Sequence, residues 1–252
     1  MGVVVTTIAV LGATSGIAGG CLREWVCRDE DETVDLRLVA RGADRLARLT
    51  ADLEVRGAGS IAVLEQALDG VDDVRAAADW VFADGPVDIV LVAFGDMPSQ
   101  EEADADPAVA AHLLDLNGTL ATMAAHLAAL RLVEQGSGSL AVLGSVAGDR
   151  GRKSNYLYGS AKAMVATAVA GLQHRVAGTG VRITLVKPGP TATPMTDHLR
   201  GGMPLAPVEV VARDVVAAVD AGRPVVYTPR RWQAIMAIIR ALPRAVFHRT
   251  NL

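Results

Sequence analysis

Thr7-Ile-Ala-Val-Leu-Gly12-Ala-Thr-Ser-Gly16-Ile-Ala18 is the segment from which the architecture of this chain is inferred. The apolar run Thr7–Leu11 predicts a short buried strand, and Gly12 follows it directly. The spacing GxxxGxA lets the backbone turn tightly and approach a pyrophosphate, while the N-terminus of the next helix offers free N–H groups. Many turns contain two glycines, but this position between a strand and a helix favours a dinucleotide-binding site.

The rest of the chain alternates between strand and helix patterns. Short apolar runs predict further strands at Leu36–Ala40, Ile61–Leu64, Asp88–Phe94, Ser139–Leu143 and Val181–Val186. Helical spacing predicts helices at Ile17–Cys27, Asp44–Val55, Val71–Phe82, Pro107–Gln135 and Tyr158–Val176. The acidic run Asp29–Asp35 is interpreted as a solvated turn. This alternation implies right-handed crossovers and a parallel sheet covered on both faces, an α/β fold in a single domain.

Composition narrows the function classes. The chain has 252 residues, of which 51% are hydrophobic, so its apolar content is too high for a disordered chain. A formal net charge of −4 argues against a nucleic-acid binder. The two cysteines, Cys21 and Cys27, lack metal-site spacing, and no metal is expected. We see no signal peptide and no uninterrupted apolar run of the roughly 20 residues that a membrane span needs.

The residues after the second and third strands bear on the choice of cofactor. An acidic residue near the end of the second strand usually holds the ribose 2′-hydroxyl of NAD. Here Ala40 takes that place and Arg41 follows, and a guanidinium can pair with the 2′-phosphate of NADPH. Asp69 is positioned to meet the adenine. The alternatives are that Arg41 is only a surface cation and that Asp69 is a helix N-cap.

Tyr158 and Lys162 form the strongest catalytic motif. Residues four apart lie on one face of a helix, so the ammonium group of Lys162 is expected near the Tyr158 hydroxyl, where it would lower the pKa of the phenol. Such a phenol can act as a general acid or base. Basic positions in this chain are nearly always arginine, with only three lysines, so a lysine here indicates a specific need.

Three further features follow strands in the order that such a site requires. Asn117 lies in the long helix after the fourth strand, Ser145 follows the fifth, and Lys187-Pro-Gly-Pro-Thr-Ala-Thr193 follows the sixth. Ligands of parallel sheets bind at the carboxyl ends of strands. Each feature has an ordinary alternative. Asn117 could be a polar residue inside a helix, Ser145 a turn residue, and Pro188-Gly189 an ordinary loop sequence, but their joint occurrence is improbable by chance.

These motifs resemble the short-chain dehydrogenase/reductase family over roughly residues 6–195, which implies a Rossmann-type doubly wound sheet. The resemblance implies a catalytic tetrad of Asn117, Ser145, Tyr158 and Lys162. With Arg41 and Asp69 included, the expected cofactor-binding residues are Gly12, Ser15, Gly16, Ile17, Arg41, Asp69, Gly95, Tyr158, Lys162, Pro188, Gly189, Thr191 and Thr193. Two departures are that Ala18 replaces a loop glycine and that Val92-Ala-Phe-Gly95 replaces the Asn-Asn-Ala-Gly of the family.

The resemblance also implies roles for the site residues. Ser145 and Tyr158 are expected to hold a ketone, with Tyr158 protonating the alkoxide and Lys162 stabilising the phenolate. Asn117 is expected to position a water, and Thr193 to contact the nicotinamide carboxamide. Residues 196–207 are interpreted as a mobile lid over the substrate.

The stretches 144–162 and 187–196 are similar to the branch of the family that reduces a polyprenylphosphoryl keto-pentose. This implies formation of decaprenylphosphoryl-arabinose in the second step of a 2′-epimerisation for cell-wall arabinan, with a flavin-dependent oxidase as partner. Such reductases are usually written with NADH, whereas Arg41 favours NADPH, and related enzymes are often homo-oligomers. The alternatives are a cytosolic reductase of a fatty-acyl, steroid or other small ketone, and a non-catalytic cofactor-binding scaffold for a partner oxidase.

Residues 230–252 are interpreted as a basic amphipathic helical tail beyond a domain of residues 1–229. The tail has five arginines and no acidic residue, and its apolar residues recur at helical spacing from Trp232 to Leu242. Such a helix either lies on an anionic bilayer or packs on its own domain or a sister subunit. We expect a cytoplasmic protein at the inner membrane face, with a cell-envelope location left open.

Overall fold

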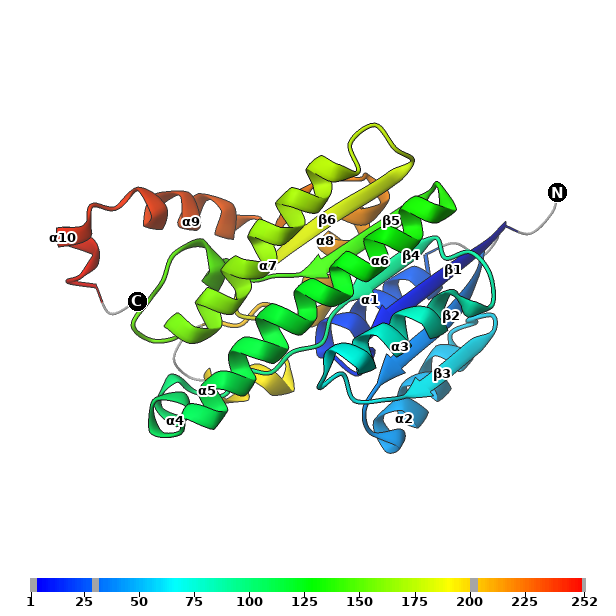
Figure 1. Ribbon diagram of the computed structural model, residues 1–252, viewed down its shortest axis with the longest axis horizontal. Helices are drawn as coiled ribbons and strands as arrows, with labels where there is room; N and C mark the ends of the chain where they lie inside the picture. The colour runs from blue at the N-terminus through cyan, green and yellow to red at the C-terminus, as the bar shows by residue number, and fades with distance from the viewer. Residues whose placement is uncertain (1–3, 29–31, 200–203, 251–252) are drawn as a thin grey trace.

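The computed structural model describes residues 4–28, 32–199 and 204–250. Seven parallel strands form one sheet in the order β3-β2-β1-β4-β5-β6-β7 (Figure 1). The strands are β1 (Val4–Leu11), β2 (Glu32–Ala40), β3 (Ile61–Glu65), β4 (Ile89–Val92), β5 (Gly138–Leu143), β6 (Val181–Pro188) and β7 (Val225–Thr228). The strand order reverses between β1 and β4, and in open parallel sheets a ligand crevice forms at that reversal, beyond the carboxyl ends of the strands. The predicted α/β fold with a parallel sheet is confirmed.

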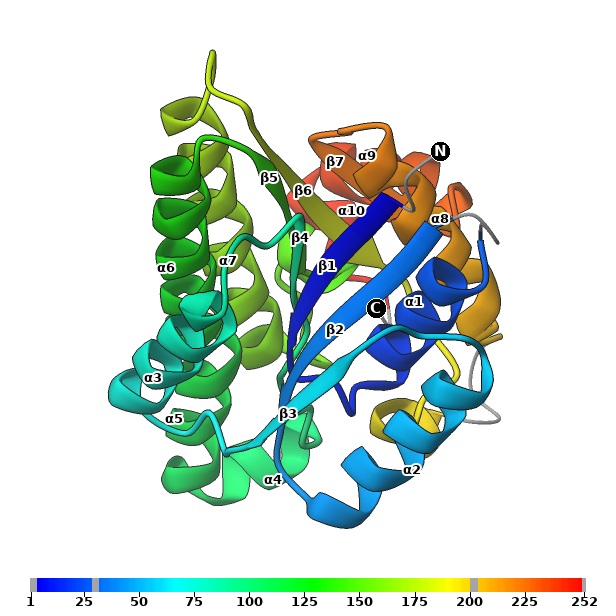
Figure 2. The same cartoon turned by 90° about the vertical axis from the view of Figure 1, so that its right-hand side faces the viewer.

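Helices cover both faces of the sheet (Figure 2). One layer holds α1 (Gly16–Val26), α2 (Ala43–Val55) and α8 (Val208–Asp220), and the other holds α3 (Val71–Ala83), α5 (Pro107–Leu114), α6 (Ala121–Gln135) and α7 (Tyr156–Arg175). The short helix α4 (Gln100–Ala105) precedes α5. Successive side chains of β1 alternate between the layers, since Ile8 and Val10 pack under the first layer and Ala9 and Leu11 under the second.

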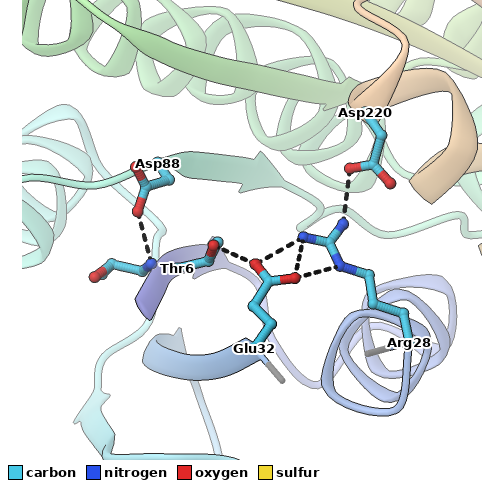
Figure 3. A network of polar contacts seen from close by, with 6 residues as sticks. Thr6, Arg28, Glu32, Asp88 and Asp220 are labelled. Atoms are coloured by element: carbon cyan, nitrogen blue, oxygen red, sulfur yellow. Dashed lines mark hydrogen bonds and ion pairs between the residues drawn. The ribbon is translucent and has the colours of Figure 1, made fainter. Parts of the chain in front are cut away.

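The acidic run before the second strand is not the solvated turn that we expected. β2 begins at Glu32 and pairs with β1 from its first residue, so residues 32–35 of that run belong to the sheet. Residues 29–31 lie outside the described residues. Figure 3 shows why the charge is tolerated: Arg28 pairs with Glu32 at 2.9 Å and with Asp220 at 2.9 Å, and Thr6 donates to Glu32. This network lies at the amino-terminal ends of β1 and β2, away from the ligand crevice.

The predicted long helix over Pro107–Gln135 is present, but it is interrupted. A π-helical turn, Asp115–Leu120, joins α5 to α6 and contains Asn117. By length and composition this stretch could cross a membrane, but 56% of its most apolar window is buried, and residues such as Ala124 and Ala128 pack in the core. The sequence prediction missed the α-helices α4 and α8, the strand β7 and two short 3-10 helices, Val146–Asp149 and Pro194–Leu199.

The C-terminal tail folds back onto the domain. It forms α9 (Arg231–Ala241) and α10 (Arg244–Phe247), which Figure 1 places at the opposite end of the molecule from the N-terminus. Met236 and Ile239 are buried in a small cluster with Val146. Arg150 donates to the carbonyl of Leu242 at 2.8 Å and lies over the Phe247 ring. The structure therefore shows the apolar face of α9 packing on its own domain, one of the two alternatives for this tail.

Candidate active site

A cavity of about 700 Å³ lies beyond the carboxyl ends of the strands. All of the site residues expected from the sequence line it: Gly12, Ser15, Gly16, Ile17, Arg41, Asp69, Gly95, Asn117, Ser145, Tyr158, Lys162, Pro188, Gly189, Thr191 and Thr193. They come from segments that follow β1, β2, β3, β4, β5 and β6. The structure thus brings together site residues that lie between Gly12 and Thr193 in the sequence.

The turn after β1 is built for close approach. Gly12 has a φ of +93°, and a Cβ there would lie 2.5 Å from the backbone nitrogen of Phe94. Its N–H and that of Ala13 donate to the Val39 carbonyl, which ties the turn to β2. Ser15 takes the N-cap position of α1 without a side-chain capping bond, and the first turn has no acidic residue. The N–H groups at this helix end are therefore free to bind a phosphate.

Two arginines gather where β2 ends. Arg41 and Arg45 are both exposed, both line the cavity, and among the described residues neither guanidinium pairs with a carboxylate. Arg45 was not expected from the sequence, because only the start of α2 turns it back toward Arg41. Free cations here, beside uncapped N–H groups at α1, fit a dinucleotide that carries a 2′-phosphate. Asp69 lines the same cavity and is not the N-cap of α3, because Gly70 takes that place.

Asn117 is only 1% exposed and makes three hydrogen bonds. Its side-chain nitrogen donates to the carbonyls of Asp96 at 2.8 Å and Leu113 at 3.0 Å, and its oxygen accepts from the Asp96 N–H at 3.3 Å. The π-helical turn places this carboxamide against the segment after β4, as π-turns often do at functional sites. Asn117 therefore braces the segment after β4 through its hydrogen bonds to Asp96.

Tyr158 and Lys162 share one face of α7, and both face the cavity. The Lys162 ammonium lies 5.7 Å from the centroid of the Tyr158 ring and donates to the Leu143 carbonyl at 3.2 Å. Burial lowers the pKa of Lys162 to about 8. Burial also raises the pKa of Tyr158 to about 12, and the Ser145 side chain acts in the opposite direction by less.

The net shift of the Tyr158 pKa is therefore opposite to the lowering that the spacing with Lys162 led us to expect. The cost of desolvating a phenolate is the largest effect on this pKa, and it outweighs the opposing hydrogen bond of the Ser145 side chain. The consequence is chemical, because near pH 7 the phenol keeps its proton while most of the Lys162 amine is charged. A tyrosine in this state can donate a proton, and a charge close by can stabilise the phenolate that remains.

The segments after β5 and β6 complete the wall of the cavity. Ser145 lies just after β5, where its hydroxyl accepts from the Ala147 N–H at 3.1 Å and its side chain hydrogen-bonds to Tyr158. After β6, the hydroxyl of Thr196 donates to the carbonyls of Thr191 and Thr193. Thr191 also forms a bridge with Ala206, which is buried.

These contacts lie near the two ends of the expected lid over residues 196–207. Thr196 and Ala206 are buried there and hydrogen-bonded to the loop after β6. Residues 200–203, the middle of the expected lid, lie outside the described residues. Nearby, a Cβ at Gly189 would overlap the indole of Trp232, so only glycine allows α9 to pack against this loop.

The sequence profile of the family described as short chain dehydrogenase matches residues 6–203. That match covers well over half of the chain and includes β1 to β6. The chain belongs to the short-chain dehydrogenase family. Membership makes it an oxidoreductase of a class that uses a nicotinamide dinucleotide.

Relatives of this short-chain dehydrogenase span nearly all of its length. It is 35% identical over 251 residues to an uncharacterized oxidoreductase of Mycobacterium tuberculosis, covering 96% of each chain. It is 33% identical over 243 residues to an uncharacterized oxidoreductase of Streptomyces coelicolor, covering 96% of this chain and 95% of the relative. A short-chain dehydrogenase from Sphingobium yanoikuyae, solved in complex with NADPH, is 25% identical with a TM-score of 0.79, covering 95% and 97% of the two chains.

Sequence reasoning missed several residues of this short-chain dehydrogenase site. Besides Arg45, the cavity is lined by Gln100, Arg152 and Asn155. Gln100 comes from the unpredicted helix α4, and the other two come from the irregular segment before α7, where no periodic pattern points to a site. Among the described residues, no group of three or more histidines, cysteines or carboxylates is placed to hold a metal ion.

Proposed function

We propose that this short-chain dehydrogenase reduces a ketone, specifically the C2 ketone of a polyprenylphosphoryl keto-pentose, to give decaprenylphosphoryl-arabinose. The observation that carries the reductase assignment is the pairing of a protonated Tyr158 with Lys162 in the cavity that Ser145 and Asn117 also line. The keto-pentose substrate rests on the resemblance of residues 144–162 and 187–196 to that branch of the family.

The residues divide the work of reduction among them. A bound reduced nicotinamide supplies a hydride to the carbonyl carbon. Ser145 and Tyr158 donate hydrogen bonds to the carbonyl oxygen, and Tyr158 then transfers its proton to that oxygen as negative charge develops there. Lys162 stabilises the resulting phenolate by its positive charge. Asn117 keeps the segment after β4 in place through its bonds to Asp96, so it acts as a positioning residue.

The cofactor of choice in this proposal is NADPH. Arg41 and Arg45 supply two guanidinium groups without carboxylate partners among the described residues, and a 2′-phosphate is the part of NADPH that NADH lacks. Ala40 supplies no carboxylate to hold a ribose 2′-hydroxyl. The similarity to reductases written with NADH argues the other way, and the arginines outweigh it because a buried or half-enclosed phosphate needs direct charge compensation.

The cavity supports a substrate with both an apolar and a charged part. Met97, Pro98 and Met195 line it with apolar side chains, and Arg152 lines it with a guanidinium. A polyprenyl phosphate presents the matching pair of groups. The second candidate substrate, a fatty-acyl, steroid or other small ketone, is favoured by the same apolar residues but leaves the charge on Arg152 unused.

The exposed part of the tail supports peripheral contact with a membrane that would carry such a lipid. Ile238 is 65% exposed and Val246 50% exposed, and Arg240, Arg244 and Arg249 are exposed around them. Apolar and basic side chains on one surface favour binding to anionic lipid. We include in the proposal a location at the inner membrane face, a flavin-dependent oxidase as supplier of the keto-pentose, and association into homo-oligomers.

A turnover assay tests the substrate proposal. Purified protein is mixed with NADPH or NADH and with a polyprenylphosphoryl keto-pentose, a steroid ketone or a 3-ketoacyl thioester, and the absorbance of the reduced nicotinamide is followed. We expect the fastest decrease with NADPH and the lipid-linked keto-sugar. Faster reduction of either soluble ketone would transfer the assignment to the second candidate, and no oxidation of cofactor with any ketone would refute the reductase assignment.

A further inference from the structure

The segment between Ser145 and α7 contains two arginines with different surroundings. Arg150 points to the tail, where it donates to main-chain carbonyls of α9 and lies 3.8 Å from the centroid of the Phe247 ring. Arg152 instead lines the cavity, and its Nε atom is buried with no hydrogen-bond partner. Among the described residues no carboxylate lies within ion-pair distance of its guanidinium.

Asp149 is the acidic residue whose charge acts on Arg152, and both of its carboxylate oxygens already have other partners. Asp149 raises the pKa of Arg152, but burial has the larger effect and lowers it. One oxygen of Asp149 accepts from Lys187 at 2.5 Å and the other accepts from the Tyr227 hydroxyl at 2.8 Å. A half-buried guanidinium without a counterion costs free energy in any fold. The presence of Arg152 beside a cavity therefore indicates a ligand that supplies the missing negative charge.

A second unpartnered polar group lies on the same segment. Asn155 takes the N-cap position of α7, where asparagine usually bonds to the first turn of the helix, but its side chain makes no such bond. Its side-chain oxygen is buried and accepts no hydrogen bond, and the residue lines the cavity. This oxygen can accept from a ligand hydroxyl, while the Arg152 fork can donate to a ligand oxyanion.

The position of Arg152 and Asn155 indicates that they contact the substrate and not the cofactor. Arg152 and Asn155 come from the segment that joins Ser145 to Tyr158, the two residues that hold the reacting carbonyl in the proposed function. Apart from Tyr158 and Lys162, the groups assigned to the dinucleotide come from other segments, at α1, at the end of β2, and after β3, β4 and β6. The anion that Arg152 would meet therefore belongs to the molecule whose carbonyl lies at Tyr158.

We infer that Arg152 and Asn155 form a subsite for an oxyanion and an adjacent hydroxyl of the ketone substrate. The guanidinium donates to the oxyanion, and the side-chain oxygen of Asn155 accepts from the hydroxyl. This inference rests on the proposed function, since it assumes a ketone at Tyr158, and it specifies that the ketone is anionic. A phosphate monoester, a phosphodiester of a lipid and a carboxylate share this chemistry.

Binding measurements separate this subsite from catalysis. The NADPH complex of the Tyr158→Phe variant, in which proton donation is blocked, is titrated by calorimetry with dihydroxyacetone, dihydroxyacetone phosphate, an alkyl phosphodiester of it, and hydroxypyruvate. We expect the best anionic probe to bind about 10-fold to 100-fold more tightly than dihydroxyacetone, as hydrogen bonds to charged groups contribute. The phosphodiester, monoester and carboxylate arms identify which source of the oxyanion the site prefers.

Added substitutions test the residues themselves. Arg152→Gln should abolish the preference for the anionic probe and leave dihydroxyacetone binding unchanged, and Arg152→Lys should restore part of it. Asn155→Ala should weaken the charged and the neutral hydroxylated probes by the same factor. The control is Arg175→Gln, which removes an exposed charge at the far end of α7 and should change nothing.

The inference is overturned if dihydroxyacetone binds as tightly as every anionic probe, if Arg152→Gln keeps the preference, or if Arg175→Gln removes it equally. The proposed function fails by a different result, namely that none of the ketones tested causes the wild-type protein to oxidise NADPH. Because the titrations need no turnover, either failure is recognised without the other.

Discussion

The Lys162 ammonium group lies over the ring face of Tyr158, 5.7 Å from its centroid, and its hydrogen bond goes to the Leu143 carbonyl and not to the phenol. Lys162 is buried and Tyr158 is partly buried, and desolvation shifts the two pKa values in opposite directions. The result is a neutral acid next to a cation at neutral pH. This arrangement suits reduction of a ketone, since the acid must hold its proton until the alkoxide forms.

The lowered pKa of Lys162 predicts how reduction depends on pH. As the pH rises through about 8, Lys162 loses its charge and the phenolate of Tyr158 loses its stabilisation, so kcat/KM for ketone reduction should fall. The pKa of Tyr158, about 12, lies too high to produce that decrease. A pH–rate profile of wild type checks this, with Lys162→Met as comparison. The variant should be slower at pH 7 and lack the decrease near pH 8, and an unchanged profile in the variant would contradict the role of Lys162.

The bonds of Asn117 predict a loss of both stability and turnover on substitution. Asn117→Ala leaves two main-chain carbonyls and one N–H without partners at a buried position, which should lower the free energy of unfolding by about 1–3 kcal/mol. Denaturant unfolding measures this loss. If Asn117 positions the segment after β4, kcat should fall more than the affinity for NADPH, and a stable variant with full kcat would rule that role out.

The two arginines after β2 predict cofactor preference. Arg41→Ala and Arg45→Ala should each weaken NADPH binding by about 10-fold to 100-fold, as the loss of one charge-assisted hydrogen bond implies, and leave NADH binding unchanged. Fluorescence titration with both cofactors measures these affinities. Arg75→Ala is the matched control, because Arg75 is an exposed arginine on α3. Equal weakening of NADH and NADPH would show that the arginines do not contact the 2′-phosphate.

The sequence predicted the sheet well because its strands are buried on both faces. β1, β4, β5 and β6 appear as short apolar runs between turns, and strand–helix alternation indicates that they are parallel. β2 was predicted too short, because Glu32 and Asp35 look like turn residues until their partners are known, Arg28 for Glu32 and the Ser60 N–H for Asp35. Contacts between residues far apart in the chain, such as Arg28 with Asp220, have no local signal in a sequence.

The candidate site was likewise predicted only in part. Residues in spaced motifs, such as Gly12, Ser145 and Tyr158, were found because the motif fixes their position relative to a strand or helix. Arg45 and Arg152 were not found, because a charged residue in a loop or on a helix surface usually faces solvent. The sequence also could not show that desolvation outweighs the charge of Lys162 at Tyr158, since burial depends on the packing of the whole cavity.

The buried pair of Asp149 and Lys187 predicts a strong effect on stability. Asp149 is 2% exposed and Lys187 13% exposed, and they join the segment after β5 to β6. Asp149→Asn leaves the Lys187 charge without its partner and should cost about 3–5 kcal/mol in the free energy of unfolding. Asp72→Asn, which breaks the exposed pair with Arg75, should cost about 1 kcal/mol or less. Similar losses from both variants would show that the Asp149 pair is not effectively buried.

The most direct measurement compares wild type with Tyr158→Phe, using the ketone that wild type reduces fastest. Cofactor affinity is measured by titration, and turnover is measured by the loss of reduced nicotinamide. If the Tyr158 hydroxyl is the proton donor, turnover should fall by about 100-fold or more, while NADPH affinity stays within about two-fold of wild type. Turnover at the wild-type rate in a variant that binds NADPH normally would contradict the account.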